Sequence, residues 1–333
     1  MIWVNGSKSP LSLAMELMKL RVIVLLQITA ICAILIHDAL VRNEVVEGTR
    51  TWVDTLLAIG LTVVGGTLSA GGSNAINMWY DADIDPHMKR TMNRPIPRGD
   101  VQAKTALLFG ITISIIGSSL FFFVHWKAAF WSFFSVLFYV FIYSIWLKRR
   151  TPQNIVIGGI AGSTPPLIGW IVASSATIPS NYNPFDVGSP IPWILFLLIF
   201  LWTPPHFWAL ALYRSGEYGK VNIPMMNEVK GPEATIKQSK FYVFLLFLLG
   251  SLPCFWPNSG IPLLWAFIAG CLTLWYALSV WQIDIHEPLD ENGRMPKAAK
   301  SFFRSLFYLG WMFISIVVVS FLPPEWLGPL GML

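Results

Sequence analysis

The sequence predicts an all-α integral membrane protein with about nine transmembrane helices. Of its 333 residues, 55% are hydrophobic and only 12% are charged, which leaves too little polar surface to cover a soluble globule of this size. Nine apolar stretches also approach the roughly 20 residues that a helix needs to cross a bilayer. None of these stretches shows the period-two alternation that is typical of a barrel strand.

The predicted spans follow one another through short or polar connections. Because lipid offers no hydrogen-bond partner to the backbone, apolar runs of this length should be helices. We expect one domain over 20–322, a cytoplasmic segment over 1–19 and a short outer tail over 323–333, since no strong repeat or flexible linker divides the chain. The expected spans are 20–36, 56–78, 106–124, 128–147, 155–173, 193–212, 241–256, 261–281 and 302–322.

The basic residues predict the orientation of these helices. If the N-terminus is cytoplasmic, all but three of the 23 Lys and Arg lie in inner segments, the exceptions being Arg42, Arg50 and Lys127. The net charge of +5 therefore reflects membrane topology and does not point to nucleic acid. The first 20 residues lack a cleavage site and a transit-peptide composition. We expect a multi-pass protein of a bacterial cytoplasmic (inner) membrane, with the C-terminus outside and the first span acting as an uncleaved signal anchor.

Acidic and amide side chains gather where the second span ends. Asn77, Asp81 and Asp85 are spaced by four and so share one face of a helix, with Asp83 between them. Pro86 disfavours the α conformation at Asp85, which puts this end of the helix near the interface. Mg²⁺ binds through one or two carboxylates together with phosphate oxygens. The pattern favours a metal site, and a solvated acidic helix end is the alternative.

A group of cations follows the acidic group directly, with Arg90, Arg94 and Arg98 within one short loop. Arginine binds phosphate oxygens through two parallel hydrogen bonds, so neighbouring anionic and cationic groups indicate a metal-diphosphate site. Inner-side topology by itself explains part of this positive charge. The Arg94-Pro95 and Ile96-Pro97 pairs predict an extended segment that lies across the mouth of the site.

The string NMWYDADIDPHM from Asn77, followed by RTMNRPIPRG from Arg90, resembles the first signature of the UbiA-type intramembrane prenyltransferases, and among them that of the enzymes that farnesylate haem. The resemblance implies a UbiA-type helical bundle with a central cavity open toward the cytoplasmic face. It further implies Mg²⁺ held by Asp81, Asp85 and Asn77, with farnesyl diphosphate and haem B as substrates and haem O as product. A haem A synthase becomes a candidate partner.

The resemblance also implies roles for two further polar regions. Lys148 and Arg149, after the fourth span, stand where such enzymes carry diphosphate-binding cations, and the same polar stretch contains the candidates Tyr143, Gln153 and Asn154. In the loop after the sixth span, where the family has its second acidic motif, this chain has Glu217 in place of the usual Asp. Glu217 is a candidate second metal ligand, with Tyr218 and Lys220 as neighbouring candidates.

A histidine and two prolines interrupt the sixth span in the string TPPHFWALA, which matches the haem-farnesylating enzymes. A histidine inside an apolar run usually faces a cavity or the interior of the bundle. His206 is therefore a site candidate that could orient haem or ligate its iron, and a plain hydrogen bond to a neighbouring helix is the alternative. Aromatic rings could shield an allylic cation; the pool is Trp79, Tyr80, Tyr139, Tyr143, Phe207 and Trp208.

Three other functions compete with the prenylation of haem. A prenyltransferase that acts on a quinone precursor or another aromatic acceptor is the main alternative, and the string around His206 argues against it. A secondary transporter should place carboxylates near the middle of the membrane and show repeats. A haem-carrying electron-transfer protein needs paired axial ligands, whereas only one of the five histidines lies well inside an apolar run.

Overall fold

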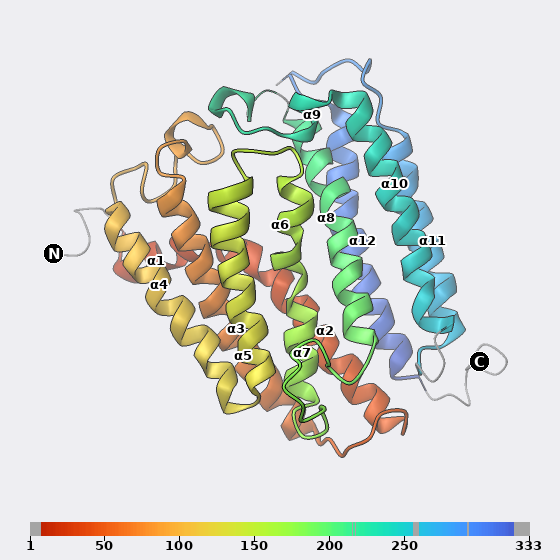
Figure 1. Ribbon diagram of the computed structural model, residues 1–333. Helices are drawn as coiled ribbons and strands as arrows, with labels where there is room; N and C mark the ends of the chain where they lie inside the picture. Colours follow the sequence, from red (N-terminus) through yellow and green to blue (C-terminus); the bar gives the residue numbers. More distant parts are fainter. Residues whose placement is uncertain (1–7, 215, 217, 256–259, 292, 323–333) are drawn as a thin grey trace.

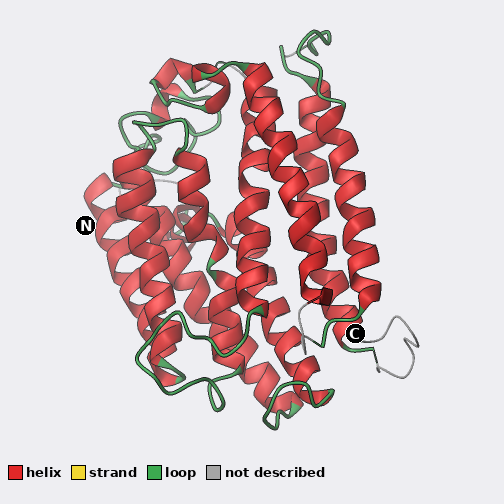
Figure 2. Ribbon diagram, turned by 45° about the vertical axis from the view of Figure 1, so that its right-hand side comes forward, coloured by secondary structure: helices red, strands yellow, loops and turns green. Residues whose placement is uncertain are grey.

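The computed structural model describes residues 8–214, 216, 218–255, 260–291 and 293–322. Every regular element in these ranges is helical (Figure 2). The main helices, arranged as in Figure 1, are α1 (Pro10–Met18), α2 (Leu20–Arg42), α3 (Trp52–Tyr80), α4 (Ala103–Leu120), α5 (Trp126–Leu137), α6 (Asn154–Ser163), α7 (Pro165–Ala173), α8 (Ile191–Tyr213), α9 (Met226–Val229), α10 (Pro232–Ser251), α11 (Leu263–Trp281) and α12 (Pro296–Ser320). Helical segments of other types are the short 3₁₀ turns η1 (Asp85–His87), η2 (Phe121–Phe123), η4 (Gly219–Val221) and η5 (Leu252–Phe255), and the ten-residue π-helix η3 (Phe138–Leu147).

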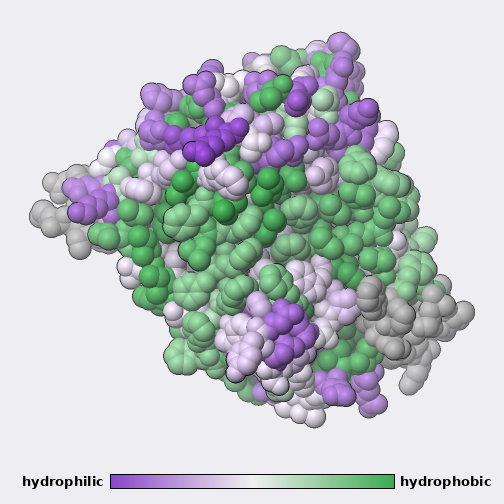
Figure 3. Space-filling model, in the orientation of Figure 1, coloured by the Kyte–Doolittle hydropathy of each residue, from purple (hydrophilic) through white to green (hydrophobic). Residues whose placement is uncertain are grey.

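Nine helical segments of the described chain are long and apolar enough to cross a membrane, which confirms the predicted spans. Three of them continue through a non-α turn, so that α4 runs into η2, α5 into η3 and α10 into η5, and a fourth consists of α6 and α7. A belt of hydrophobic side chains crosses the middle of the molecule, with hydrophilic residues above and below it (Figure 3). The helices therefore stand roughly parallel within one apolar layer.

Small residues allow α3 and α4 to pack most closely. A Cβ at Gly72 would collide with the hydroxyl of Ser114 and with the carbonyl of Gly110 on α4. A Cβ at Gly117 would meet the backbone of Gly65 and Ser69 on α3. Such contacts are the usual means by which helices associate in lipid, where apolar burial alone gives no driving force.

The centre of the bundle is formed by the span of α6 and α7 and by α8, whose residues are mostly buried, whereas less than half of each other span is buried. Pro165 begins α7, because a proline is tolerated in the first turn of a helix. Pro204 and Pro205 lie inside a single helix α8, and the hydroxyl of Thr203 donates to the carbonyl of Ile199 there. Gly158 of α6 leaves room for the ring of Tyr143, so its role is close packing.

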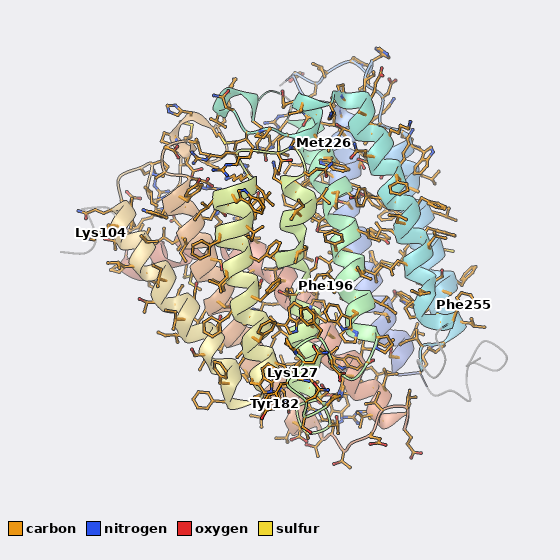
Figure 4. All side chains as sticks on the ribbon, viewed as in Figure 1. Lys104, Lys127, Tyr182, Phe196, Met226 and Phe255 are labelled. Atoms are coloured by element: carbon orange, nitrogen blue, oxygen red, sulfur yellow. The ribbon has the colours of Figure 1, made fainter. Side chains whose placement is uncertain are left out.

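Buried ion pairs and hydrogen bonds organise the end of the bundle where α2 ends and α3 begins. Asp38 of α2 is fully buried, and it accepts hydrogen bonds from Arg50 at 2.9 Å and from Thr55 of α3 at 2.6 Å. At the same end, which Figure 4 marks by Lys127 and Tyr182, the ammonium group of Lys127 donates to the carbonyls of Pro179 and Asp186. These contacts hold the connections at this end in place.

The opposite end, at the top of Figure 1, carries the connecting segments 81–102, 148–153, 218–225 and 282–291. An amphipathic helix that the sequence analysis did not anticipate, α1, lies beside this end and packs against α3. Its Leu13 and Leu17 are buried, whereas Leu11 and Met15 are exposed. The segment 1–19 thus contains a docked helix over 10–18 and is more than a polar leader.

Candidate functional site

The predicted acidic residues lie where α3 leaves the apolar layer. Regular α-helix ends at Tyr80, earlier than the expected end near Asp85, and Asp81 caps it. The backbone nevertheless continues to turn, because the amide of Asp81 donates to the carbonyl of Asn77 at 3.0 Å and that of Asp85 donates to Asp81 at 2.9 Å. The spacing of four residues therefore still stacks Asn77, Asp81 and Asp85 on one side of the chain.

Asp81 is the most enclosed of the carboxylates, with 1% of its surface exposed. Its Oδ2 accepts a hydrogen bond from the ammonium group of Lys148, the residue that follows the π-helix η3. The other oxygen, Oδ1, has no hydrogen-bond partner and lies 3.8 Å from Nη2 of Arg149. A buried carboxylate oxygen without a partner is rare, and it leaves a position for a cation.

Asn77 connects the acidic residues to two helices. Its Nδ2 donates to Oγ of Ser144 in η3 at 3.2 Å, and its Oδ1 accepts from Nζ of Lys19 at 3.1 Å. Lys19 links α1 to α2 in the left-handed conformation, with φ 56° and ψ 52°. A non-glycine residue in this conformation costs about 1–2 kcal/mol and often occurs at functional sites. The structure adds Lys19 and Ser144 to the predicted site, and neither belongs to a motif that would have revealed it.

Asp85 is held by Arg94, whose Nη1 lies 2.8 Å and 2.7 Å from the two carboxylate oxygens. The hydroxyl of Thr91 also donates to the backbone carbonyl of Asp85 at 2.9 Å. The prediction of an extended segment here was wrong, because residues 88–101 form consecutive turns. The amide of Gly99 donates to the carbonyl of Ile96 at 3.0 Å, a turn in which Pro97 supplies the fixed φ and Gly99 takes a positive φ of 79°.

Asp83 points to a different partner than its acidic neighbours. It forms two parallel hydrogen bonds of 2.7 Å with Arg149, whose guanidinium also lies 4.8 Å from the centre of the Tyr80 ring. These bonds with Arg149 hold the pKa of the Asp83 carboxyl below its usual value. Asp83 is exposed, and its contribution is to fix Arg149 beside Asp81.

Charges of opposite sign lie close together in this cluster. Four cations, Lys19, Arg94, Lys148 and Arg149, surround three carboxylates. Burial lowers the pKa of the Lys148 ammonium group, and the charge of Asp81 opposes this shift. Burial likewise lowers the pKa of Lys19, reinforced by the nearby charges of Arg94 and Lys148. A strongly anionic ligand would relieve both lysines, so the cluster is suited to a diphosphate.

The remaining inner-face candidates support this cluster or lie apart from it. Asn154 is buried, and its Nδ2 joins two loops by donating to the carbonyls of Thr151 at 2.7 Å and Pro224 at 3.3 Å. Gln153 beside it is exposed. Asn154 therefore positions the loop that carries Lys148 and Arg149.

The loop after α8 packs against the start of the arginine loop, residues 88–101, because Tyr218 and Met225 lie in one apolar cluster with Met88. The guanidinium of Arg90 lies 5.9 Å from the ring centre of the buried Tyr218. Lys220 is exposed. Glu217, the candidate second metal ligand, lies outside the described residues. The structure thus places Tyr218 of this loop beside Arg90.

The guanidinium of Arg98 binds partners other than Asp81, Asp83 and Asp85. Its guanidinium donates to Glu16 of α1 at 2.8 Å and to the carbonyl of Asn93 at 2.7 Å, and it pairs with Asp100 at 2.6 Å. The hydrogen bond from Lys8 is the main cause that lowers the pKa of Glu16, with Arg98 contributing further. Arg98 therefore fastens α1 to the arginine loop.

His206 is buried between α8 and α12. Its ring stacks on Trp202 at 4.2 Å and on Phe302 at 4.7 Å between centres, and its Nδ1 lies 2.6 Å from Oγ of Ser305. That hydroxyl donates to the carbonyl of Phe302, so it accepts from His206 and Nδ1 carries the proton. The described contacts of His206 are those of a histidine held by a neighbouring helix, and they leave Nε2 as the acceptor nitrogen.

Aromatic side chains of the predicted pool separate into two groups. Tyr139 and Tyr143 stack at 5.4 Å along η3, where the amide of Lys148 donates to the carbonyl of Tyr143 five residues back. Tyr143 and Phe207 pack in one apolar cluster with Tyr218. Trp208 instead is fully buried, and its ring contacts Tyr242 of α10. π-Helical segments are frequent at functional sites, because they shift side chains out of α register.

The donor set fits a divalent metal ion that also binds a phosphate ligand. Among the described residues, no group of three His, Cys, Asp or Glu side chains could enclose a metal by itself. Mg²⁺ needs only one or two carboxylates when substrate phosphates complete its oxygen shell. Asp81 Oδ1 is the unpaired buried oxygen that such an ion would use, with Asp85 and Asn77 stacked beside it.

A family model described as the UbiA prenyltransferase family matches residues 47–307. The chain belongs to the UbiA prenyltransferase family. It is a multi-pass membrane enzyme of this family, with nine candidate spans among its described residues. It is 40% identical to a protoheme IX farnesyltransferase of Bartonella tribocorum over 94% of this chain and 92% of that protein. It is also 41% identical to a protoheme IX farnesyltransferase of Parvibaculum lavamentivorans over 88% of this chain and 86% of the other.

Solved structures confirm the UbiA fold. A digeranylgeranylglyceryl phosphate synthase superposes with a TM-score of 0.70 at 18% identity, covering 93% of this chain and 98% of the other. A UbiA homologue from Archaeoglobus fulgidus bound to DMAPP and Mg²⁺ superposes with a TM-score of 0.58 at 13% identity, covering 92% of this chain and 99% of the other. The predicted helical bundle is therefore confirmed.

Proposed function

We propose that this chain transfers the farnesyl group of farnesyl diphosphate to a vinyl group of haem B, with addition of water, to give haem O. The identity to protoheme IX farnesyltransferases over almost the whole chain supports this acceptor and this donor. The cluster around Asp81 supplies a matching site for the metal and the diphosphate.

In this proposal Asp81, Asp85 and Asn77 hold Mg²⁺, and Glu217 is a candidate ligand for a second ion. When bound, the metal supplies positive charge that stabilises the departing diphosphate. Lys148 and Arg149 stand against Asp81, and both would turn toward the diphosphate as the metal takes their place at the carboxylates. Such fixed positive charges stabilise the negative charge that grows as the allylic carbon–oxygen bond breaks.

Further cations extend the diphosphate site on both sides. Arg94 approaches from the arginine loop, Lys19 from the start of α2, and Arg90 from beside Tyr218. The loose transition state of such a transfer demands little covalent help from the protein, so positioning and charge are its main contributions. Because four cations outnumber three carboxylates here, the site is prepared for an anionic substrate with its metal.

The stacked tyrosines of η3 and the ring of Phe207 offer π surfaces to the allylic cation. His206 uses Nδ1 to bind Ser305, so Nε2 is the atom that would meet haem. We place the enzyme in a bacterial cytoplasmic membrane as one domain over 20–322, with the N-terminus inside, the C-terminus outside, and a haem A synthase as the candidate acceptor of its product. Bacterial relatives and the basic inner loops support this placement.

The test is a reaction of the purified protein with haem B, Mg²⁺ and farnesyl diphosphate, with the products identified by mass spectrometry. We expect a haem that carries a hydroxyethylfarnesyl group. If the folded protein instead prenylates only an aromatic quinone precursor, the proposed acceptor is refuted while the family activity stands. If it uses no prenyl diphosphate at all, the proposed site chemistry fails as well.

A further inference from the structure

Two rows of side chains are exposed or half-buried at the edge of the bundle, on the neighbouring helices α11 and α12 (Figure 1). The residues of each row are spaced by three or four positions and so share one face of their helix. The row on α12 starts with two cations, and all other members of both rows are apolar. We call this surface the α11–α12 seam; its members are Cys271, Trp275 and Leu278 of α11 and Lys300, Arg304, Phe307 and Trp311 of α12.

Arg304 joins the two rows. Its guanidinium lies 4.8 Å from the ring centre of Trp275, and its Nη1 donates to the backbone carbonyl of the same residue at 3.2 Å. Within the described part of the chain, no carboxylate forms an ion pair with Arg304 or Lys300. Lys297, one turn before Lys300, does have such a partner, since its Nζ lies 3.7 Å from Asp284. Arg304 and Lys300 therefore carry positive charge that the described chain does not balance.

The position of Arg304 along its helix makes this charge notable. α12 begins at Pro296, eight residues earlier, so Arg304 stands about 12 Å along the helix at 1.5 Å per residue. Trp275 likewise precedes the end of α11 at Trp281 by six residues, or about 9 Å. Phe303 beside it is exposed. Charged side chains are costly next to lipid, so an arginine at this depth indicates a polar partner.

The chemistry of the seam specifies that partner. One N–H of Arg304 is used by the carbonyl of Trp275, and a guanidinium has five, so a fork remains that matches two oxygens of a phosphate. Lys300 adds a second positive charge one helical turn nearer the start of α12. Phe307 and Trp311 continue the row as an exposed apolar strip. A phosphate that carries long apolar chains would satisfy both parts of the surface.

We propose that the α11–α12 seam binds an anionic phospholipid, with its phosphate on Arg304 and Lys300 and one acyl chain along the apolar members of both rows. Basic residues beside transmembrane helices are a usual site for anionic lipid head groups. The site is separate from the charged cluster, because Asp81 and its partners lie on α1, α3, η3 and the loops that follow them. The lipid is bound whichever acceptor the enzyme prenylates.

The bound lipid has a structural consequence for α12. Phe302 and Ser305, which flank the seam in sequence, contact His206 from the opposite side of the same helix. A lipid that bridges α11 and α12 braces the helix that holds His206. We therefore expect anionic phospholipid to raise the melting temperature of the purified protein.

The first test is binding of phosphatidylglycerol to the purified protein in detergent, followed by native mass spectrometry, with phosphatidylcholine of the same acyl chains for comparison. We expect phosphatidylglycerol to bind more tightly. The double variant Arg304→Gln with Lys300→Gln should weaken its binding roughly thirtyfold, or about fivefold for each charge. The matched control is Arg21→Gln with Lys104→Gln, which removes the same two kinds of cation from exposed positions on α2 and α4 and should leave binding unchanged. Lys104 stands on the opposite side of the bundle from α11 (Figure 4).

Cys271 gives a second test that needs no change to the cations. It is exposed, whereas the other two cysteines of the chain, Cys32 and Cys254, are buried. Because Cys271 lies one turn from Trp275 on the apolar part of the seam, a bound acyl chain should slow the reaction of its thiol with N-ethylmaleimide. Phosphatidylglycerol should protect the thiol of wild type and of the control, and the double variant should lose this protection.

Three results would overturn the proposal. The first is equal affinity of wild type and the double variant for phosphatidylglycerol, and the second is equal protection of Cys271 by phosphatidylcholine. The third is displacement of the lipid by inorganic diphosphate or by farnesyl diphosphate, which would assign the two cations to a free phosphate ligand or to the substrate.

Discussion

The ion pair between Asp81 and Lys148 allows a sharp test of the proposed metal site through Asp81→Asn. The substitution keeps the shape of the side chain and removes its charge. Asp81 is 1% exposed, and the side chain of Lys148 is 14% exposed, so both charges are largely removed from water. Removing one partner of a buried pair costs about 3–5 kcal/mol. Because Lys148 keeps some contact with solvent, we expect the lower part of this range.

Activity should fall more steeply than stability explains. Loss of a preorganised group that stabilises developing charge lowers the rate by about 10²–10³, and Asp81 supplies a buried carboxylate oxygen that has no hydrogen-bond partner among the described residues and is free for a metal. The assays are denaturant unfolding in detergent and formation of prenylated haem measured on the folded fraction. In calorimetry with diphosphate present, Mg²⁺ should bind more weakly to the Asp81→Asn variant than to wild type.

A double-mutant cycle with Lys148→Gln separates the structural from the catalytic role. Removing both charges should recover part of the lost stability, with a coupling energy within about 0.5–3 kcal/mol, because no unpaired buried charge remains. Activity should not recover, since both the metal ligand and a diphosphate cation are missing. If Asp81→Asn retains activity within an order of magnitude of wild type, Asp81 does not hold the metal and the assignment of the site is wrong.

Four further predictions follow from the structure. Lys19→Met should raise the KM for farnesyl diphosphate roughly tenfold in steady-state assays, because a charge-assisted contact is worth about 1.5–3 kcal/mol, and an unchanged KM would exclude Lys19 from the diphosphate site. Mg²⁺ and diphosphate should each bind more tightly when the other is present, and calorimetry should give the same factor for both, because Mg²⁺ frees the cations and diphosphate frees the carboxylates of the ion pairs at Asp81 and Asp85. An Mg²⁺ affinity that is the same with and without diphosphate would contradict this coupling. His206→Leu should weaken haem binding in a spectral titration and leave the KM for farnesyl diphosphate unchanged, whereas Ser305→Ala should mainly lower the free energy of unfolding, by about 1–3 kcal/mol. Equal haem affinity in wild type and His206→Leu would show that His206 has only a packing role. Lys127→Met should destabilise the protein by about 3 kcal/mol in unfolding experiments, because the loop carbonyls at the opposite end lose their donor, and a loss of activity in the folded fraction would contradict a purely structural role.

The sequence by itself determined the helices and the chemical character of the site. Nine apolar runs predicted nine spans, and each is present within the described chain with shifts at its ends. This succeeded because the need to bond every backbone group inside lipid acts on each segment separately. The stacking of Asn77, Asp81 and Asp85 also follows from spacing alone, since hydrogen bonds between residues four apart persist beyond the end of α3.

The tertiary structure alone decided which charge meets which. Lys148 contacts Asp81, which is 67 residues away in the sequence, and Lys19 contacts Asn77, which is 58 residues away. A local sequence pattern cannot predict contacts over such separations. Arg98 belongs to the same motif as Arg94, yet Arg98 binds Glu16 of the docked helix α1, whereas Arg94 binds Asp85. Hydropathy and spacing describe how one segment interacts with its surroundings, whereas ion pairing depends on how separate helices approach. The site therefore became a set of paired charges only once α1, α3 and η3 were placed side by side.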